Sequence, residues 1–391
     1  MNRKLFLLAL CQGLFLTNNV TFIAINGLVG LALAPLSWLA TLPVTAYVVG
    51  AALSTGPVAR SQRQLGRKRS FQIGLVVAAV SAGICAWAAA TGQFWLLVTA
   101  TFIAGYYSAN ASLYRFAAPE LAAPSYKEKA ISLVLAGGIV GAVVGPNLAN
   151  ITRSLLPTPF VGAYLALIVV ALLSLLIMTC IDFPRHIAPA PGTSTGRSLR
   201  NIARQPVFLV AVAGASLGYA VMNLLMAATP LAMQMHAHPF GNIAIVLELH
   251  VLGMFLPSFF TGHLIKRFGV LPIMGTGVAL MFICVAIALS GISLMQFTIA
   301  LLTLGVGWNF LYIGGSTLLT EAYHPDEKNK AQGAMDFCVF TCVAVSSFAS
   351  GVLITTQGWM WINLGSLVPL LVISMALWWM ARQRLTAVAQ R

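Results

Sequence analysis

The sequence predicts an all-α membrane protein with twelve transmembrane helices in two six-helix pseudo-repeats. Three observations support this fold class. Of the 391 residues, 59% are hydrophobic and only 8% are charged, and the mean hydropathy is +0.90, whereas a soluble protein has about 25% charged residues. The chain contains twelve apolar runs of membrane-spanning length. Its two halves also share residues at a constant offset of about 201 positions, as between Glu120 and Glu321.

The apolar runs define the predicted helices in chain order, because a spanning helix needs about 20 apolar residues. The first run follows Met1-Asn-Arg-Lys4 and begins like a signal peptide. It continues well past the length of such a segment, so it is predicted to be the first transmembrane helix. The predicted spans are 4–30, 36–59, 70–90, 94–116, 130–151, 159–181, 206–232, 241–264, 271–290, 294–318, 331–353 and 360–381.

The net charge of +14 indicates topology rather than nucleic-acid binding. Lys and Arg occupy alternate connections between the spans, and only Arg153 falls on the other side. An excess of basic residues marks the cytoplasmic side of a membrane protein. Both termini are therefore predicted to be cytoplasmic, and no nucleic-acid partner is expected. The basic segments are the N-terminus, 60–69, 115–129, 185–204, 266–267, 328–330 and the C-terminus.

The internal similarity divides the chain into two bundles and a linker. Residues 1–183 are predicted to form an N-terminal six-helix bundle, and 206–391 a C-terminal one. Between them, 184–205 is rich in Pro, Gly, Ser and Arg, which is typical of a linker. The shared residues lie at a junction between a loop and a helix; they are Glu120, Pro124, Lys127, Lys129 and Ala130 in the first half, and Glu321, Pro325, Lys328, Lys330 and Ala331 in the second.

This arrangement resembles the major facilitator superfamily. The loop signature of that family appears in altered form as Gly262-His-Leu-Ile-Lys-Arg-Phe-Gly269 and as Gly66-Arg67-Lys68-Arg69, with Arg63 and Lys266 where Asp is usual. The resemblance implies a substrate site near the middle of the bilayer between the halves, lined by helices 1, 4, 7 and 10. It also implies transport by rocking one half against the other.

Soft metal-ligand side chains recur at helical spacing in the C-terminal half, which holds twelve of the fourteen Met and five of the six His. Neighbours three or four residues apart share one face of a helix, and thioether and imidazole groups together suit copper. Packing is the competing explanation for a Met stripe, because Met fills gaps well. The central set is Met222, Met226, His250 and Met254, beside Tyr219; Met233, Met235, His236 and His238 form a collecting group at the mouth, and Met335, Cys338 and Cys342 an exit stripe.

The pair Met222-x-x-x-Met226 and His250-x-x-x-Met254 resembles the motifs of the copper-importing CcoA-type branch of that superfamily. The resemblance implies import of copper across a bacterial inner membrane, in support of cbb-type cytochrome oxidase assembly. Copper would then be the cargo, with no prosthetic group, and cytoplasmic thiols or a copper chaperone would receive it. The protein is expected to act as a monomer in the lipid bilayer.

Two carboxylates within the spans are candidates for proton coupling, since charged groups inside a membrane are usually functional. Glu248 lies about 200° around its helix from His250, and could instead pair with a polar group on helix 5. Asp336 could pair with Lys328, Lys330 or Arg115. The polar and aromatic residues of helices 1, 4 and 10 could contact an organic substrate or bond neighbouring helices; they are Asn18, Asn19, Tyr106, Tyr107, Asn110, Trp308, Asn309 and Tyr312.

Two other functions remain open beside copper import. A proton-coupled transporter of a drug or small metabolite would use the same helices, with His250 and Glu248 as proton sites. A sensor or assembly factor would bind copper without carrying it. Enzymatic chemistry is not expected, because no nucleophile, base and orienting group cluster outside the bilayer.

Overall fold

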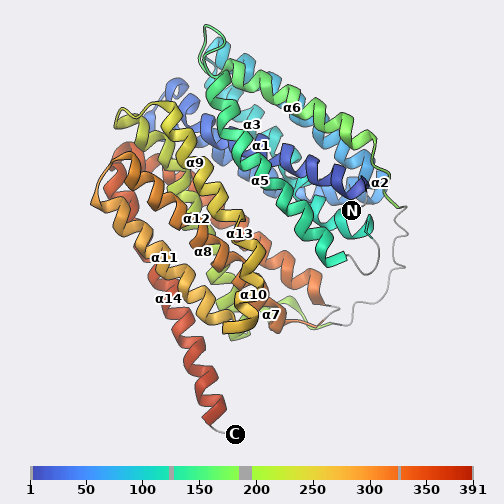
Figure 1. The fold of residues 1–391 in the computed structure, drawn as a ribbon, viewed down its shortest axis with the longest axis vertical. Helices are drawn as coiled ribbons and strands as arrows, with labels where there is room; N and C mark the ends of the chain where they lie inside the picture. Colours follow the sequence, from blue (N-terminus) through green and yellow to red (C-terminus); the bar gives the residue numbers. More distant parts are fainter. Residues whose placement is uncertain (1–2, 123–126, 185–195, 325–326, 390–391) are drawn as a thin grey trace.

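The computed structural model describes residues 3–122, 127–184, 196–324 and 327–389. Helices make up the fold, and the described residues form no strand. Two bundles stand side by side in Figure 1, one built from the first part of the chain and the other from the last. This confirms the predicted all-α membrane architecture.

The first half contains α1 (Arg3–Leu33), α2 (Leu42–Thr91), α3 (Phe94–Ala111), α5 (Lys127–Thr152) and α6 (Val161–Thr179). The short elements η1 (Ser37–Leu39), α4 (Tyr114–Ala117) and η2 (Ala118–Glu120) connect them. The second half contains α8 (Pro206–Met235), α9 (Phe240–Phe255), α10 (Ser258–Phe268), α11 (Val270–Ser290), α12 (Leu294–Leu319), α13 (Lys328–Thr356) and α14 (Gly358–Ala389). Two further short elements, α7 (Leu199–Ala203) and η4 (Thr320–Ala322), precede α8 and follow α12.

The predicted spans map onto these helices with two differences in continuity. The spans 36–59 and 70–90 belong to the single 50-residue element α2, which is interrupted at Gly66, where φ is +78°. A helix of that length is about 75 Å long, enough for two crossings. The span 241–264 is divided into α9 and α10, which are bent by 42°. Pro257 stands at that bend, and proline cannot continue the hydrogen bonding of a helix.

Length and hydropathy identify eight of the described helices as able to cross a membrane, and α9 with α10 makes a ninth. The break at Gly66 turns α2 into two crossings. The apolar helices α3 and α5 lie between the crossings of the first half and complete the predicted twelve. The predicted span 94–116 ends earlier than expected, because α3 stops at Ala111 and a turn separates it from α4.

Glycines allow the helices of the first half to approach closely. A Cβ added at Gly50 would overlap the backbone of Phe102, and one at Gly105 would overlap the backbone of Ala51. Small residues at such crossings let α2 and α3 pack backbone against backbone. In the second half, α12 packs against α8, α9 and α11. It therefore brings residues of these three helices close to its own side chains.

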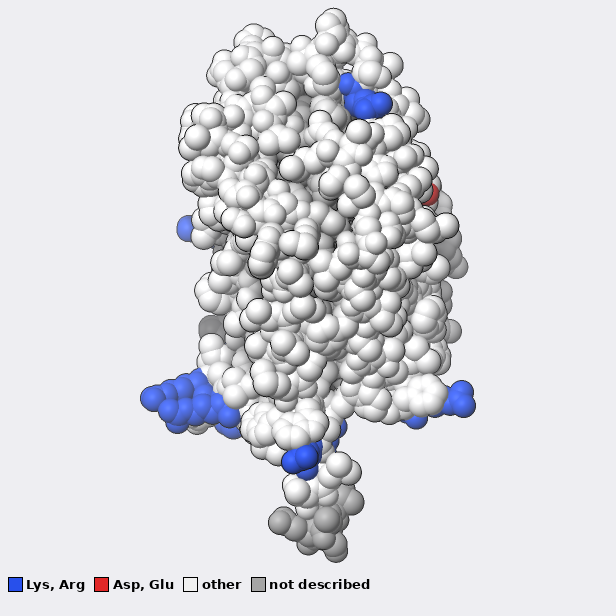
Figure 2. Space-filling model, turned by 90° about the vertical axis from the view of Figure 1, so that its left-hand side faces the viewer, with Lys and Arg blue, Asp and Glu red and all other residues white. Residues whose placement is uncertain are grey.

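The ion pairs of the described residues gather at one end of the molecule, called the basic end below. Arg67 pairs with Glu120 at 2.6 Å, Lys68 with Asp182 at 2.7 Å, and Arg384 with Glu321 at 2.6 Å. On the face shown in Figure 2, most Lys and Arg side chains lie toward the lower end. This distribution agrees with the charge asymmetry predicted from the connections.

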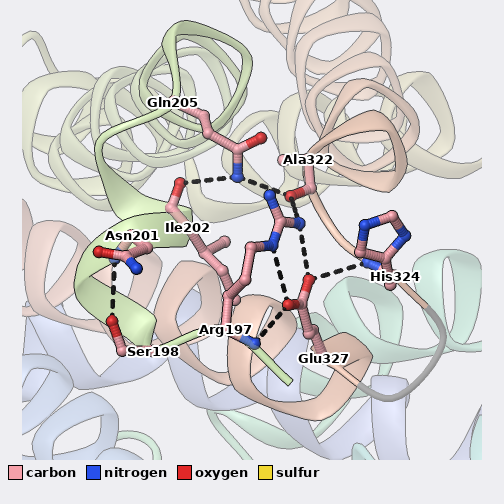
Figure 3. A network of polar contacts seen from close by, with 8 residues as sticks. All are labelled: Arg197, Ser198, Asn201, Ile202, Gln205, Ala322, His324 and Glu327. Atoms are coloured by element: carbon pink, nitrogen blue, oxygen red, sulfur yellow. Dashed lines mark hydrogen bonds and ion pairs between the residues drawn. The ribbon is translucent and has the colours of Figure 1, made fainter. Parts of the chain in front are cut away.

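The last part of the predicted linker is fastened to the second half (Figure 3). The carboxylate of Glu327 accepts hydrogen bonds from the backbone N–H of Arg197 at 2.7 Å and from its guanidinium at 2.7 and 2.9 Å. The carbonyl of Ala322 accepts from Arg197 and from Gln205. Residues 199–203 form α7 rather than irregular linker, with Ser198 as its N-cap. Residues 185–195 of the predicted linker lie outside the described part of the chain.

The two halves touch each other toward the end opposite to the basic end. Thr41 donates a hydrogen bond to the carbonyl of Ser347 at 2.8 Å, and the ring of Trp38 packs edge-on against Phe348 at 6.0 Å. A further contact joins the halves: the guanidinium of Arg153 lies 5.0 Å above the ring of Phe240. These contacts join the two halves at that end.

Candidate functional site

An aromatic cluster on the second half faces the interface between the halves. The rings of Trp308 and Tyr312 on α12 are stacked, with centroids 5.1 Å apart and planes 10° from parallel. Tyr219 on α8 meets both rings edge-on, at 5.2 and 5.7 Å. Phe255, the last residue of α9, packs against Trp308 from a third side at 6.2 Å. Three helices thus supply one aromatic surface.

Local sequence explains why these rings meet. Trp308 and Tyr312 are four residues apart, so they lie one above the other on α12. Gly218 precedes Tyr219, and a Cβ at that position would press against Leu311; the glycine therefore lets α8 come close to α12. Trp308 is almost fully buried, and its indole N–H finds no hydrogen-bond partner among the described residues. A buried donor without a partner is costly, and this one would reach a ligand only if the surrounding side chains move.

Polar residues of the first half lie across from this cluster. The amide of Asn19 on α1 donates a hydrogen bond to the hydroxyl oxygen of Tyr47 on α2 at 3.1 Å. Tyr47 also packs against Phe22, with ring centroids 5.4 Å apart. The helix of Asn19, α1, contacts α8, which carries Tyr219. Tyr47 was not among the residues that we expected here. A hydroxyl-bearing aromatic inside the predicted span 36–59 is the sequence signal that could have indicated it.

Arg115 on α4 is a half-buried positive charge of the first half, and Asp336 on α13 is a half-buried carboxylate of the second half. The guanidinium of Arg115 lies 4.7 Å above the ring of Phe116, and its Nε is buried without a hydrogen-bond partner in the described part of the chain. Asp336 forms no ion pair with two of its three expected partners, Arg115 and Lys330, whose side chains the structure describes. The side chain of the third, Lys328, lies outside the described residues.

The other polar candidates hold helices together. Asn309 on α12 donates hydrogen bonds to the carbonyl of Met254 and the hydroxyl of Ser258, and accepts one from Thr261. Asn110 donates to the carbonyl of Ser70 at 2.7 Å. Asn18 and Tyr107 are buried, whereas Tyr106 is half-buried. Asn19, Tyr106 and Tyr312 are the half-buried members of the expected organic-substrate set that hold no helix pair together through a backbone hydrogen bond within the ranges that the structure describes, whereas Trp308 contributes through its ring contacts within the cluster.

The central set of soft ligands is buried in the second half. Met222, Met226 and Met254 belong to the main apolar core. His250 is fully buried, and its Nδ1 lies 2.7 Å from the carbonyl oxygen of Leu301 on α12. Because a carbonyl can only accept, the ring proton resides on Nδ1, and the Nε2 lone pair is buried without a described partner. The structure thus gives His250 a helix-to-helix contact, and copper binding by this set stays a prediction.

The group expected at the mouth does not converge on one point. Met233 is fully buried, whereas Met235 and His236 are exposed. The Nε2–H of His238 donates to the carbonyl of Ile292 at 2.8 Å, and its ring packs edge-on against Phe297. His238 therefore ties the loop after α8 to the loop before α12. That tertiary contact is not visible in the local sequence.

The residues of the expected exit stripe all lie on α13. Met335 is buried, while Cys338 and Cys342 are half-buried. Across the described ranges, no three His, Cys, Asp or Glu side chains form a group that could hold a metal ion. The role of this stripe in copper release stays a prediction.

Glu248 pairs with a residue of the other half. The amide of Asn147 on α5 donates a hydrogen bond to its carboxylate at 2.8 Å. This bond agrees with one of the two alternatives for Glu248, a polar partner on helix 5, and it joins α5 to α9 where the halves meet. A role of Glu248 in proton coupling stays a prediction.

Comparison with known proteins identifies the family. The sequence model described as Major Facilitator Superfamily matches residues 5–256 and 224–391. The chain is 39% identical over 363 residues to the riboflavin transporter RfnT of Brucella anthropi, covering 92% of this chain and 91% of that protein. It is 27% identical to the uncharacterized MFS-type transporter YddS of Bacillus subtilis, covering 88% of this chain and 83% of that protein.

Solved structures agree with this assignment at the level of the fold. The nucleoside transporter NupG superposes with a TM-score of 0.74 at 12% identity, covering 96% of this chain and 99% of that one. A bacterial homologue of the human lysosomal transporter Spinster, in an inward-facing and unoccupied conformation, gives a TM-score of 0.74 at 14% identity, covering 98% and 97%. These relatives and structural neighbours are transporters, not enzymes. The chain therefore belongs to the major facilitator superfamily and is a multi-pass secondary transporter.

Proposed function

We propose that this transporter carries a small organic molecule with a planar aromatic ring system, of the riboflavin class, rather than copper. The observation that carries the proposal is the similarity to a riboflavin transporter over nearly the whole of both chains. The cargo predicted from the Met and His pattern has no comparable support. The alternative of a small-metabolite transporter fits the family relationship better.

The chemistry of the interface between the halves supports this cargo. Riboflavin has a flat, fused ring system that carries carbonyl and ring-nitrogen acceptors, and a flexible chain of hydroxyl groups. The stacked Trp308 and Tyr312 rings, with Tyr219 at their edge, offer a surface on which a flat ring can pack. The unpartnered indole N–H of Trp308 is a donor for a ring carbonyl. On the first half, Asn19 and Tyr47 can hydrogen-bond hydroxyl groups.

Arg115 and Asp336 supply the charges of the proposed site. Both are half-buried, and they come from opposite halves. A guanidinium without a paired carboxylate can donate to acceptors of the substrate, and charges within membrane segments are usually functional. We assign Arg115 to substrate binding. We assign Asp336 to proton coupling in preference to Glu248, whose carboxylate is already held by Asn147.

The transport cycle is proposed to rock the halves 1–183 and 206–391 about this site. The excess of Lys and Arg at the basic end supports a cytoplasmic location of that end; we propose that the protein lies in the inner membrane of a bacterium with both termini in the cytoplasm. The contacts of Thr41 with Ser347 and of Arg153 with Phe240 close the opposite end. The present conformation then faces the cytoplasm, and transport requires these contacts to break.

Binding to the purified protein tests the proposed cargo. Riboflavin fluorescence is quenched when its ring stacks on tryptophan or tyrosine, so titration into protein in detergent should give saturable quenching. Lumiflavin, which keeps the ring and lacks the hydroxyl chain, should compete, while ribitol, which lacks the ring, should compete far less. Quenching that does not saturate, or equal competition by ribitol, would contradict recognition of the ring.

A further inference from the structure

A shallow groove of about 500 Å³ runs along the outer surface of the second half, away from the interface between the halves. Its walls come from the first residues of α11 and from the last third of α14. The lining residues are Leu271, Pro272, Leu377, Trp378, Ala381, Arg384 and Leu385. Apart from one arginine, the lining is apolar.

The α14 part of the lining is a continuous stripe. Leu377, Ala381 and Arg384 follow one another at intervals of four and three residues, which places them on one face of the helix. Trp378 is 57% exposed and Leu385 is 70% exposed. Leu377 is buried at the base of the groove, whereas Trp378 and Leu385 beside the stripe are accessible along the last turns of α14, which projects from the rest of the molecule toward the C-terminus in Figure 1.

Positive charges border this apolar stripe at the basic end. The guanidinium of Arg382 lies 4.0 Å above the ring of Trp378. Stacking on a ring face fixes the position of a guanidinium while leaving its in-plane N–H groups able to bind an anion. Arg384 uses one terminal nitrogen for its ion pair with Glu321 at 2.6 Å. Two arginines thus stand where an apolar groove reaches the end of a membrane-spanning helix.

We propose that the groove binds a phospholipid with an anionic headgroup. Its acyl chain lies along Trp378, Ala381 and Leu385, and its phosphate is bound by Arg382, which the ring of Trp378 holds in place. A surface of a spanning helix is surrounded by lipid, so an acyl chain is the apolar occupant that is always present there. Arg382 supplies the charge complementarity that selects an anionic headgroup over a neutral one, and Arg384 adds positive charge from the other side of the groove. This site is separate from the proposed riboflavin site and does not depend on it.

Native mass spectrometry of the protein from mixed vesicles tests this site. With equal amounts of phosphatidylglycerol and phosphatidylcholine, wild-type protein should retain phosphatidylglycerol preferentially. Arg382→Gln leaves the ion pair of Arg384 with Glu321 intact and should lower this retention about fivefold, the effect expected for one arginine near anionic lipid. The double variant Arg382→Gln/Arg384→Gln should abolish the preference.

Arg267→Gln is the matched control. Arg267 on α10 also lies over an aromatic ring, that of Phe268 at 5.1 Å, but it does not line the groove. This variant should keep the wild-type preference. The proposal is overturned if wild-type protein retains both lipids equally, or if Arg267→Gln and Arg382→Gln lower retention to the same extent. Thermal unfolding of each variant shows whether it is folded, and retention is compared only among folded variants.

Discussion

The rings of Trp308 and Tyr312 stack with planes only 10° apart, and both meet the edge of Tyr219. This aromatic surface is proposed to bind the flat ring of the substrate. Trp308→Ala should therefore weaken riboflavin binding about tenfold, because aromatic pairs contribute about 0.5–1.5 kcal/mol beyond the area that they bury. Trp308→Phe should weaken riboflavin binding less than Trp308→Ala does. The control Trp361→Ala removes an exposed tryptophan on α14 and should leave the dissociation constant from fluorescence quenching unchanged.

Arg115 is expected to contribute to substrate binding through its charge. Arg115→Gln should weaken riboflavin binding about tenfold, the loss typical of a hydrogen bond to a charged group.

Asp336→Asn should leave binding nearly unchanged but remove the dependence of uptake on a proton gradient. Riboflavin uptake by Arg115→Gln and by Asp336→Asn is measured in proteoliposomes with and without an imposed pH difference. Arg63→Gln, at the break of α2, is the matched charge control. Equal uptake by Asp336→Asn and wild type under a pH gradient would exclude the coupling role.

The hydrogen bond from Asn147 to Glu248 should favour the conformation in which the opposite end is closed. Glu248→Ala removes one such bond, worth about 0.5–1.5 kcal/mol, and should shift the equilibrium between the two conformations about two- to tenfold. Glu248→Gln keeps an acceptor and should shift it less. Distances between spin labels on η1 and on the loop after α8 report the two populations. Identical distance distributions for Glu248→Ala and wild type would show that this bond does not bias the conformation.

The hydrogen bonds from Arg197 to the carboxylate of Glu327 should make the stability of the fold depend on pH. The hydrogen bonds from Arg197, and then that from the backbone of His324, lower the pKa of Glu327 from 4.5 to about 2. A carboxyl group whose pKa is lower in the folded protein stabilises it above the unfolded pKa, and that stabilisation is lost as the pH falls toward 2. Glu327→Gln should thus lower the melting temperature at pH 6, and its difference from wild type should shrink toward pH 3.

The matched control for the pair of Arg197 and Glu327 is the variant Glu321→Gln. Glu321 forms an ion pair with Arg384 at the protein surface, where such pairs contribute little. Glu321→Gln should therefore change the melting temperature less than Glu327→Gln does at pH 6. A difference between Glu327→Gln and wild type that is the same at pH 6 and pH 3 would mean that the ionised carboxylate is not what stabilises the fold.

Much of the fold could be predicted from the sequence because hydropathy and charge are local properties. Runs of apolar residues gave the spans, and the angle between Glu248 and His250 on one helix predicted that Glu248 faces away from His250, with a partner on helix 5 as one of two alternatives. The division of α2 at Gly66 and the bend at Pro257 follow from residue types whose backbone preferences are known. The contacts of the candidate site depend instead on which helices meet.

His250 shows why the site was harder to predict. Its hydrogen bond to Leu301 exists because Gly253 and Gly305 let α9 and α12 approach closely, and no local pattern reveals that approach. Met222, Met226 and Met254 have the same spacing whether they fill a core or bind an ion. The substrate was likewise hard to predict from the sequence. The surface of Tyr219, Trp308 and Tyr312 joins residues almost 100 positions apart and forms only after the helices pack.

Uptake by cells tests the central claim most directly. Cells that cannot make riboflavin would express wild type, Trp308→Ala or Met226→Leu, and be given labelled riboflavin or labelled copper in parallel. Met226→Leu conserves volume and should be tolerated. The account predicts riboflavin uptake by wild type and Met226→Leu, a strong loss in Trp308→Ala, and no copper uptake above empty cells. Copper uptake that disappears in Met226→Leu, with no riboflavin uptake in wild type, would contradict it.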